Sequence, residues 1–141
     1  MSAVWKVYGS DSRTKNMQPV ILVADDESDS ADLLGMLLEI HFPDSTVCVA
    51  HGGQLALDQA HLQAPQVAVL DLEMPGLDGE SLALALRASF SSDPPFLVAL
   101  SGNVGRLAAI SHNGAFDHHM SKPANVDGLV RLLKKVLDSR R

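Results

Sequence analysis

Four strand-like segments of this chain end in polar or charged residues that could act together. Asp25 and Asp26 follow the first segment, Asp71 follows the second, and Ser101 and Lys122 follow the other two. If the segments are parallel strands of one open sheet, these residues lie along its carboxyl edge, where such sheets bind ligands. Three carboxylates gathered there would repel one another, and a hard divalent cation such as Mg²⁺ would offset the repulsion. The pattern therefore predicts one small polar pocket.

The composition argues against several other classes of function. The 141 residues carry a formal net charge of −6 without a basic stripe, so we expect no direct binding of nucleic acid. No apolar run approaches the ~20 residues that span a bilayer, and the N-terminus lacks the apolar core of a signal peptide. The single Cys48 excludes an intrachain disulfide. We therefore expect a cytoplasmic protein with one domain and no membrane insertion.

Strand and helix patterns alternate from Pro19 onward. Apolar runs predict strands near residues 20–24, 47–50, 67–70, 96–100 and 115–120, and a helix is expected after each of them. In the last helix, Leu129 and Leu133 belong to a regular apolar face and should be core residues. This alternation predicts an α/β domain whose parallel sheet is covered by helices on both sides.

Residues 1–18 differ from the rest of the chain because they are polar and lack core periodicity. We interpret them as a flexible leader in front of a domain at residues 19–141. The exception is the short run at residues 4–8, which holds the only Trp and the only Tyr. The alternative interpretation is that this run forms an edge strand or a docking segment.

The motifs, in this order, resemble the receiver domain of two-component response regulators, including the chemotaxis regulators. The resemblance covers about residues 19–137 and rests on Asp25-Asp26, on Asp71 with Met-Pro-Gly-Leu-Asp-Gly at 74–79, on Ser101 and on Lys122-Pro123. It implies a flavodoxin-like doubly wound fold. Its sheet would have five parallel strands in the order 2-1-3-4-5, counted from the strand at residues 20–24, flanked by five helices.

The resemblance also implies a phosphorylation site that depends on a metal ion. Asp71 would be the phosphoacceptor and would take a phosphoryl group from a phosphohistidine partner. Asp25, Asp26, Asp71 and the backbone carbonyl of Glu73 would hold Mg²⁺, an ion that prefers six oxygen ligands and keeps several waters. The cation would offset the repulsion between the attacking carboxylate and the phosphoryl group.

Lys122, Ser101 and His119 would complete the site by the same resemblance. Lys122 would bring its positive charge close to the phosphoryl oxygens. The peptide bond from Lys122 to the proline that follows it would be cis. Ser101 would donate its hydroxyl to the same group. His119 stands where the family mostly has Tyr or Phe, so Ser101 and His119 would form the conformational switch. The side chains of Glu73 and Asn103 would flank the phosphoryl group and tune its loss to water.

We therefore expect a signalling switch rather than an enzyme, with only slow self-dephosphorylation. Its partners would be a histidine kinase or a histidine phosphotransfer protein and a downstream target protein, and activation could produce a homodimer. Arg106, His119 and Leu132 are candidates for the output surface. Only Asp138 to Arg141 follow the last helix, so we expect a stand-alone receiver or a receiver excised from a longer regulator or hybrid kinase.

Two other functions compete with this interpretation. A Mg²⁺-dependent aspartyl-phosphate phosphatase similar to haloacid-dehalogenase-like proteins would also use Asp71 as its nucleophile. Those proteins carry D-x-D after their first strand, whereas Asp71 is followed by Leu72 and Glu73, and the chain leaves no room for a cap domain. A receiver-like binding module that is never phosphorylated is the other alternative, and the acid pair and Lys122 argue against it.

Overall fold

The computed structural model describes residues 5–8 and 18–140, which form six strands and five helices. The strands are β1 (Trp5–Tyr8), β2 (Val20–Ala24), β3 (Thr46–Ala50), β4 (Val67–Asp71), β5 (Phe96–Ser101) and β6 (His118–Ser121). The helices are α1 (Ser28–His41), α2 (Gly53–Leu62), α3 (Gly79–Ser89), α4 (Val104–Ile110) and α5 (Val126–Ser139). Within these described residues, no helix is both long and apolar enough to cross a membrane.

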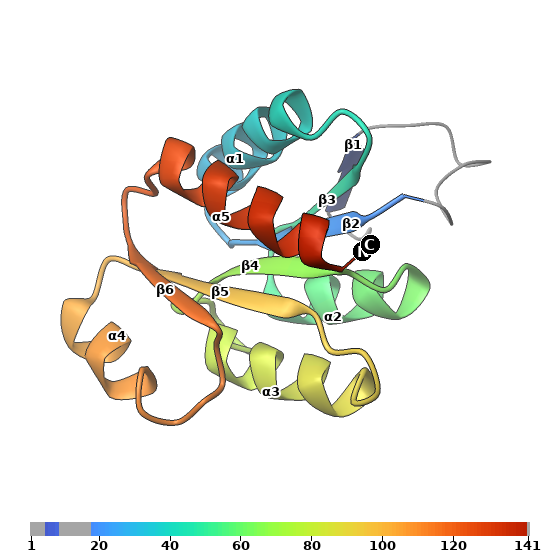
Figure 1. The fold of residues 1–141 in the computed structure, drawn as a ribbon. Coiled ribbons are helices and arrows are strands. Elements are labelled where there is room, and N and C mark those ends of the chain that lie inside the picture. Colours follow the sequence, from blue (N-terminus) through green and yellow to red (C-terminus); the bar gives the residue numbers. More distant parts are fainter. Residues whose placement is uncertain (1–4, 9–17, 141) are drawn as a thin grey trace.

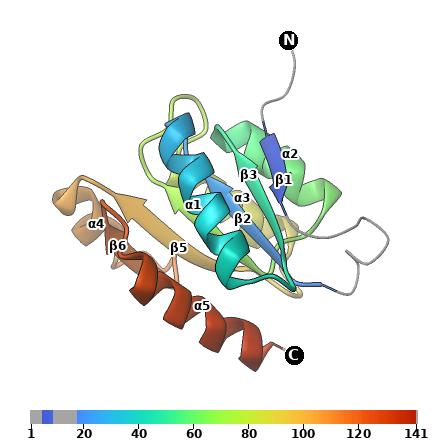
Figure 2. The same ribbon diagram turned by 90° about the horizontal axis from the view of Figure 1, so that it is seen from above.

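The sheet lies between two layers of helices. α1 and α5 run along one face, and α2, α3 and α4 cover the other (Figures 1 and 2). From β3 to β6 the strands are parallel and follow the order β3-β2-β4-β5-β6. Counted from β2, this is the predicted order 2-1-3-4-5, so the fold prediction is confirmed.

β1 adds a strand that the preferred interpretation of residues 1–18 did not include. It pairs antiparallel with β3, with Trp5 opposite Ala50 and Tyr8 opposite Val47. For these four residues the structure replaces the flexible leader with the edge strand that was the alternative. The rest of the predicted leader, residues 1–4 and 9–17, lies outside the described residues, and the boundary of the domain stays a prediction.

Both faces of the central strands are buried, which explains why their sequences are continuous apolar runs rather than alternating ones. All five residues of β4 are buried. Val69 packs into the core formed with α1 and α5, and the next residue, Leu70, packs into the core formed with α2, α3 and α4. Leu129 and Leu133 of α5 are fully buried, so their assignment to the core is confirmed.

The start of α3 is packed directly against the end of β4, where Asp71 lies. The amide of Gly79 donates to the carbonyl of Leu72 over 3.2 Å. A Cβ added at Gly79 would lie 2.3 Å from the carbonyl oxygen of Asp71 and 2.8 Å from the Cα of Leu72. Both are backbone atoms, so a side chain here would have to move the strand end or the helix. Glycine at this position therefore helps to set the place of Asp71.

Replacing Gly79 with alanine should destabilise the protein by at least ~2 kcal/mol, because backbone atoms cannot move aside as a flexible side chain can. Gly105→Ala in the exposed first turn of α4 is a matched control, since its added Cβ would meet only the side chain of Asn103, at 3.4 Å. We expect the free energy of unfolding of that variant to exceed that of wild type by no more than about 1 kcal/mol. Urea denaturation measures both, and equal stabilities would show that the contact at Gly79 is not tight.

Candidate functional site

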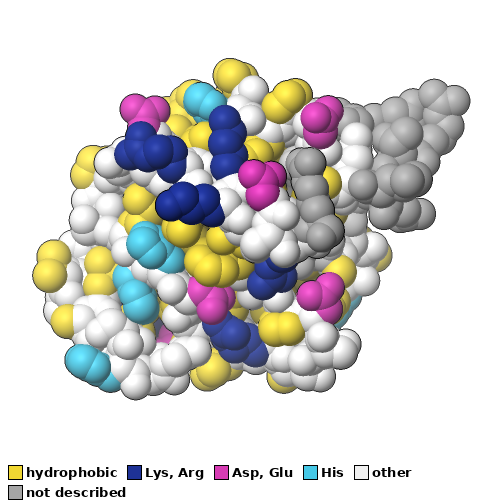
Figure 3. All heavy atoms as spheres, viewed as in Figure 1, with side chains coloured by type: hydrophobic (Ala, Val, Ile, Leu, Met, Phe, Trp, Pro, Cys, Tyr) yellow, Lys and Arg dark blue, Asp and Glu magenta, His cyan; other side chains and the backbone are white. Residues whose placement is uncertain are grey.

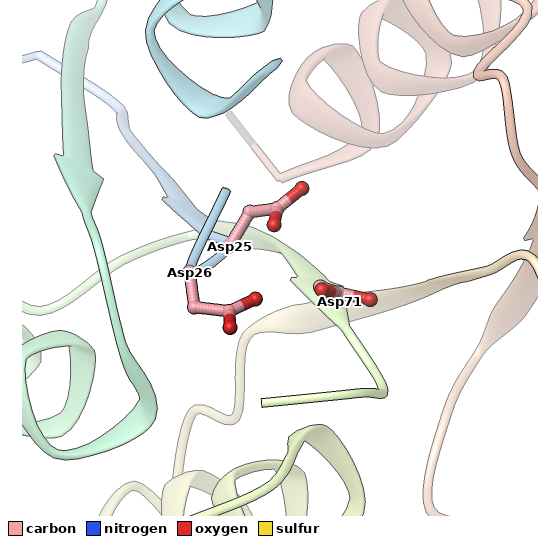
Figure 4. Close-up of side chains that lie close together, drawn as sticks. All are labelled: Asp25, Asp26 and Asp71. Atoms are coloured by element: carbon pink, nitrogen blue, oxygen red, sulfur yellow. The ribbon is translucent and has the colours of Figure 1, made fainter. Parts of the chain in front are cut away.

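Three carboxylates meet at the carboxyl edge of the sheet. Asp25 and Asp26 follow β2, and their carboxylates lie beside that of Asp71, the last residue of β4 (Figure 4). One carboxylate oxygen from each residue lies within 4.8 Å of the others. Asp25 and Asp71 are buried, whereas Asp26 is exposed. A set of three carboxylates open to solvent on one side fits a hard divalent cation that keeps part of its hydration shell.

The turns that follow the two strands fix the orientation of the buried carboxylates. Oδ1 of Asp25 accepts a hydrogen bond from the amide of Glu27 over 2.9 Å. In the same way, Oδ1 of Asp71 accepts one from the amide of Glu73 over 3.2 Å. Each aspartate thus bonds to the amide two residues further along the chain, a local pattern that aspartate favours in turns. The cluster is therefore held by its own loops before any ligand binds.

The ammonium group of Lys122 bridges the two buried carboxylates. Nζ lies 3.2 Å from Oδ2 of Asp25 and 3.3 Å from Oδ1 of Asp71. The amide of Lys122 donates to the carbonyl of Ser101 over 2.9 Å, which ties the end of β6 to β5. The bond from Lys122 to Pro123 is cis, as predicted. Lys122 thus reaches the pocket from the end of β6, which is two strands away from β4 in the sheet.

Two pKa values in the pocket are raised. Burial and the negative charge of Asp25 raise the pKa of Asp71 from 3.8 to about 6, although Lys122 and the amide of Glu73 act in the opposite direction. Burial opposes the charged form of Lys122, but the attraction of Asp25 and Asp71 outweighs it and raises the pKa of the ammonium group. The pocket therefore favours additional positive charge next to its carboxylates.

Ser101 lies at the end of β5 beside this cluster, but its hydroxyl is engaged elsewhere. Its Oγ donates to Oε1 of Glu73 over 2.5 Å and accepts from the amide of Asn103 over 2.9 Å. The side chain of Asn103 caps α4 by accepting from the amide of Arg106. The sequence prediction placed Glu73 and Asn103 near the site and missed the bond between Glu73 and Ser101. The parallel pairing of β4 with β5 was the signal that could have indicated this bond. Because Asp71 lies opposite Leu100, the residues that come next in the two segments lie near each other.

The residues proposed for the output surface have different surroundings. His119 in β6 is half-buried, its ring lies 6.4 Å from that of Phe116, and Nε2 has no hydrogen-bond partner among the described residues. Burial, with a smaller effect of His118, lowers the pKa of His119. Leu132 is half-buried against the α1–α5 core, and Arg106 forms an ion pair with Asp78. Histidine side chains are visible at the surface over β6 and α4 (Figure 3).

Asp71→Asn should stabilise the metal-free protein at neutral pH, because it removes a charge that the folded pocket disfavours. The pKa of Asp71 is higher in the folded chain, about 6 against 3.8, so wild type loses stability as the pH rises through this range. The difference corresponds to about 3 kcal/mol, and we expect a gain of about 1–3 kcal/mol for the variant at pH ~7.5 and almost none near pH ~4.

Urea denaturation in EDTA at the two pH values measures this gain. Asp44→Asn is the control, since Asp44 is an exposed aspartate outside the pocket and should show no comparable difference. A variant at Asp71 that is less stable than wild type at neutral pH would show that Lys122 fully compensates the buried charge.

Comparison with known proteins agrees with this geometry. The model of the response regulator receiver domain family matches residues 21–134. The transcriptional regulatory protein TrcR of Mycobacterium tuberculosis is 34% identical over 118 residues, which make up 83% of this chain and 44% of TrcR. The chain spans about half the length of the first curated relatives it matches, from 44% to 53%.

Solved receiver domains share the fold. The signal receiver domain of a DNA-binding response regulator from Colwellia psychrerythraea 34H superposes with a TM-score of 0.77 and 27% identity, over 86% of this chain and 99% of that one. The response regulator TrrA of Thermotoga maritima, solved in complex with Mg²⁺ and BeF, gives a TM-score of 0.73 and 27% identity over 84% and 99%. The family match, the parallel sheet and the acidic pocket lead to one conclusion: this chain belongs to the response regulator receiver domain family.

Proposed function

We propose that this receiver takes a phosphoryl group onto Asp71 from a phosphohistidine of a partner protein and thereby changes a surface that a downstream protein binds. The observation that carries the proposal is the buried carboxylate of Asp71, with two further carboxylates and the ammonium of Lys122 around it. The raised pKa of Asp71 supports it as well, because strongly perturbed groups gather at functional sites.

Asp25, Asp26 and Asp71, with the backbone carbonyl of Glu73, would hold Mg²⁺ at this edge of the sheet. When bound, the ion would offset the negative charge that gathers as a phosphoryl group approaches the carboxylates. Asp26 is exposed and can turn toward the ion or toward water, whereas Asp25 and Asp71 are held by the amides of Glu27 and Glu73. The two buried residues would thus give the site its geometry and Asp26 would add charge.

In the transfer, a carboxylate oxygen of Asp71 would form a bond to phosphorus while the N–P bond of the phosphohistidine breaks. Lys122 is 3.3 Å from that carboxylate and would stay close enough to contact the phosphoryl oxygens. Ser101 would add its hydroxyl after release from Glu73. His119, with a half-buried ring in the neighbouring strand β6, would then change its packing, and Arg106, His119 and Leu132 would form part of the output surface.

A groove beside the pocket supports the proposed protein donor. It has a volume of about 470 Å³ and opens onto Asp25 and Lys122. The other residues that line it are mostly apolar and come from α1, β5, the loop between β6 and α5, and the start of α5: Ser30, Leu33, Leu34, Leu37, Leu100, Pro123, Ala124 and Val126. Leu33, Met36 and Ile40 continue an exposed apolar stripe along α1. An amphipathic helix seated in such a groove would bring a phosphohistidine close to Asp71.

The resulting function is a signalling switch with slow self-dephosphorylation. TrcR carries the name of a transcriptional regulatory protein, and this chain matches only 44% of its length, so the match concerns less than half of that regulator. The donor would be a histidine kinase or a histidine phosphotransfer protein. The output would pass through contact with another protein or domain, because the chain has a net charge of −6 and no basic stripe for nucleic acid.

With acetyl phosphate and Mg²⁺, wild type should gain one phosphoryl group that hydroxylamine removes, as expected for an acyl phosphate on Asp71. Intact-mass spectrometry measures the gain. Asp71→Asn should gain none, and EDTA should prevent the reaction of wild type, since the carboxylates would then repel the donor. Asp58→Asn on the exposed side of α2 serves as the control and should react like wild type. Equal labelling of Asp71→Asn would refute the assignment.

Asp26→Ala should weaken Mg²⁺ binding on the order of tenfold, because a hard cation depends on the number of carboxylate oxygens around it. The fold should persist, since Asp26 is exposed. Asp29→Ala removes another exposed carboxylate three residues further on and should leave the Mg²⁺ affinity unchanged. Calorimetric titration compares the two variants, and equal affinities would remove Asp26 from the site.

Leu33→Asn should slow phosphotransfer from a phosphorylated histidine kinase by on the order of tenfold while leaving labelling by acetyl phosphate unchanged, because it removes apolar contact area from the groove. Asparagine adds no charge near the carboxylates. Leu84→Asn on α3 is the matched control, since Leu33 and Leu84 are 58% and 54% exposed. If both variants receive phosphate from the kinase at the wild-type rate, the donor does not use this groove.

A further inference from the structure

The hydroxyl of Ser101 carries the single proton over which two acceptors would compete. A serine hydroxyl has one proton to donate. In this structure it goes to Oε1 of Glu73 over 2.5 Å, while the amide of Asn103 donates to the oxygen of the same hydroxyl over 2.9 Å. Ser101 is fully buried, so no bulk water replaces either partner. As long as this bond exists, Ser101 has no proton for a phosphoryl group on Asp71.

Glu73 is in turn contacted by Arg106, which also pairs with the residue that caps α3. Nη1 of Arg106, in α4, lies 3.7 Å from Oε2 of Glu73. Nη2 of the same guanidinium donates to Oδ2 of Asp78 over 2.9 Å, and Asp78 caps α3 by accepting from the amide of Ser81. Arg106 thus sits between two carboxylates. The chain of contacts keeps Glu73 turned toward Ser101 and connects the pocket to the starts of α3 and α4.

The exposure of Glu73 makes its bond to Ser101 reversible. Its side chain is 42% exposed, so water can solvate the carboxylate once Ser101 leaves it. The hydroxyl of Ser101 would then donate to the phosphoryl group instead of the Glu73 carboxylate. No buried donor is left without a partner in this exchange. The cost of the exchange falls on the phosphorylated state, because a phosphoryl group must displace an existing charge-assisted hydrogen bond.

We propose that the carboxylate of Glu73 is a latch that holds Ser101 in the unphosphorylated arrangement by taking the proton that the phosphoryl group needs. This inference rests on the proposed phosphorylation of Asp71. It assigns to the Glu73 side chain a positioning role that is separate from the role of its backbone carbonyl toward Mg²⁺. The latch opposes the uptake of the phosphoryl group, and it acts through the hydroxyl of Ser101 rather than through charge alone.

Removal of the latch should favour the phosphorylated state. Glu73→Ala should increase the affinity for beryllofluoride and the rate of labelling by acetyl phosphate, both with Mg²⁺, on the order of tenfold, the size of one charge-assisted hydrogen bond. Glu73→Gln keeps an acceptor without charge and should fall between wild type and Glu73→Ala. Glu80→Ala in the first turn of α3 removes a neighbouring carboxylate that is bonded to Asn113, and it should change neither quantity.

The decisive measurement repeats Glu73→Ala in two further backgrounds. In Ser101→Ala the hydroxyl is absent, so Glu73→Ala should change the beryllofluoride affinity by less than about twofold, whereas in Ser101→Thr the full effect should return. A metal-free readout is the NMR signal of the Asn103 amide, which donates to Oγ of Ser101. This signal should shift in Glu73→Ala and stay in place in Glu80→Ala.

Each result decides for or against the latch. An equal gain from Glu73→Ala with and without the hydroxyl would show that only charge matters and would overturn the proposal, as would no gain or an unmoved Asn103 amide. If neither wild type nor Glu73→Ala takes up phosphate or beryllofluoride, the proposed function fails and the latch fails with it. If wild type is labelled and the Glu73 variants match it, the proposed function stands and the latch alone is refuted.

Discussion

The repulsion among three carboxylates at one sheet edge is the constraint on which the rest of the site depends. Asp25 and Asp71 are buried and share Lys122 as their positive neighbour, yet burial and mutual repulsion still raise the pKa of Asp71 to about 6. Such an arrangement costs stability in the free protein. It persists because the sheet and its loops hold the groups together, and a cation or a ligand with positive charge recovers the cost on binding.

Ordinary packing of the strand ends holds the carboxylates close together despite their repulsion. β4 is buried on both faces, so its last residue cannot retreat from the pocket without exposing core side chains. Gly79 lets α3 begin directly against the carbonyl of Asp71, which closes the strand end from the other side. The packing of the apolar strand residues therefore fixes where the carboxylates lie. The carboxylates in turn determine which ligand this edge of the sheet can bind.

The sequence was sufficient for the parts of this structure that depend on periodicity and on order along the chain. Buried parallel strands appear as apolar runs, and the residue after each run must lie on the carboxyl edge, so Asp25, Asp71 and Lys122 were predicted together. β1 was not preferred because a four-residue run carries little periodicity, and its antiparallel partner β3 lies about 40 residues away. The bond from Ser101 to Glu73 escaped prediction because it depends on the rotamers of two side chains, one at the end of β5 and one in the loop after β4.

The packing of the helices indicates where a change at Ser101 can spread. α5 buries five residues, among them Leu129 and Leu133, so moving it would open the core. α4 is short, and Ile110 is its one buried residue among those described, while Val104 at its start is 72% exposed. Elements with few buried contacts are the ones that shift at low cost. Arg106 connects α4 to Glu73, so release of Ser101 would act on the helix that the fold holds least firmly, and α5 would stay in place.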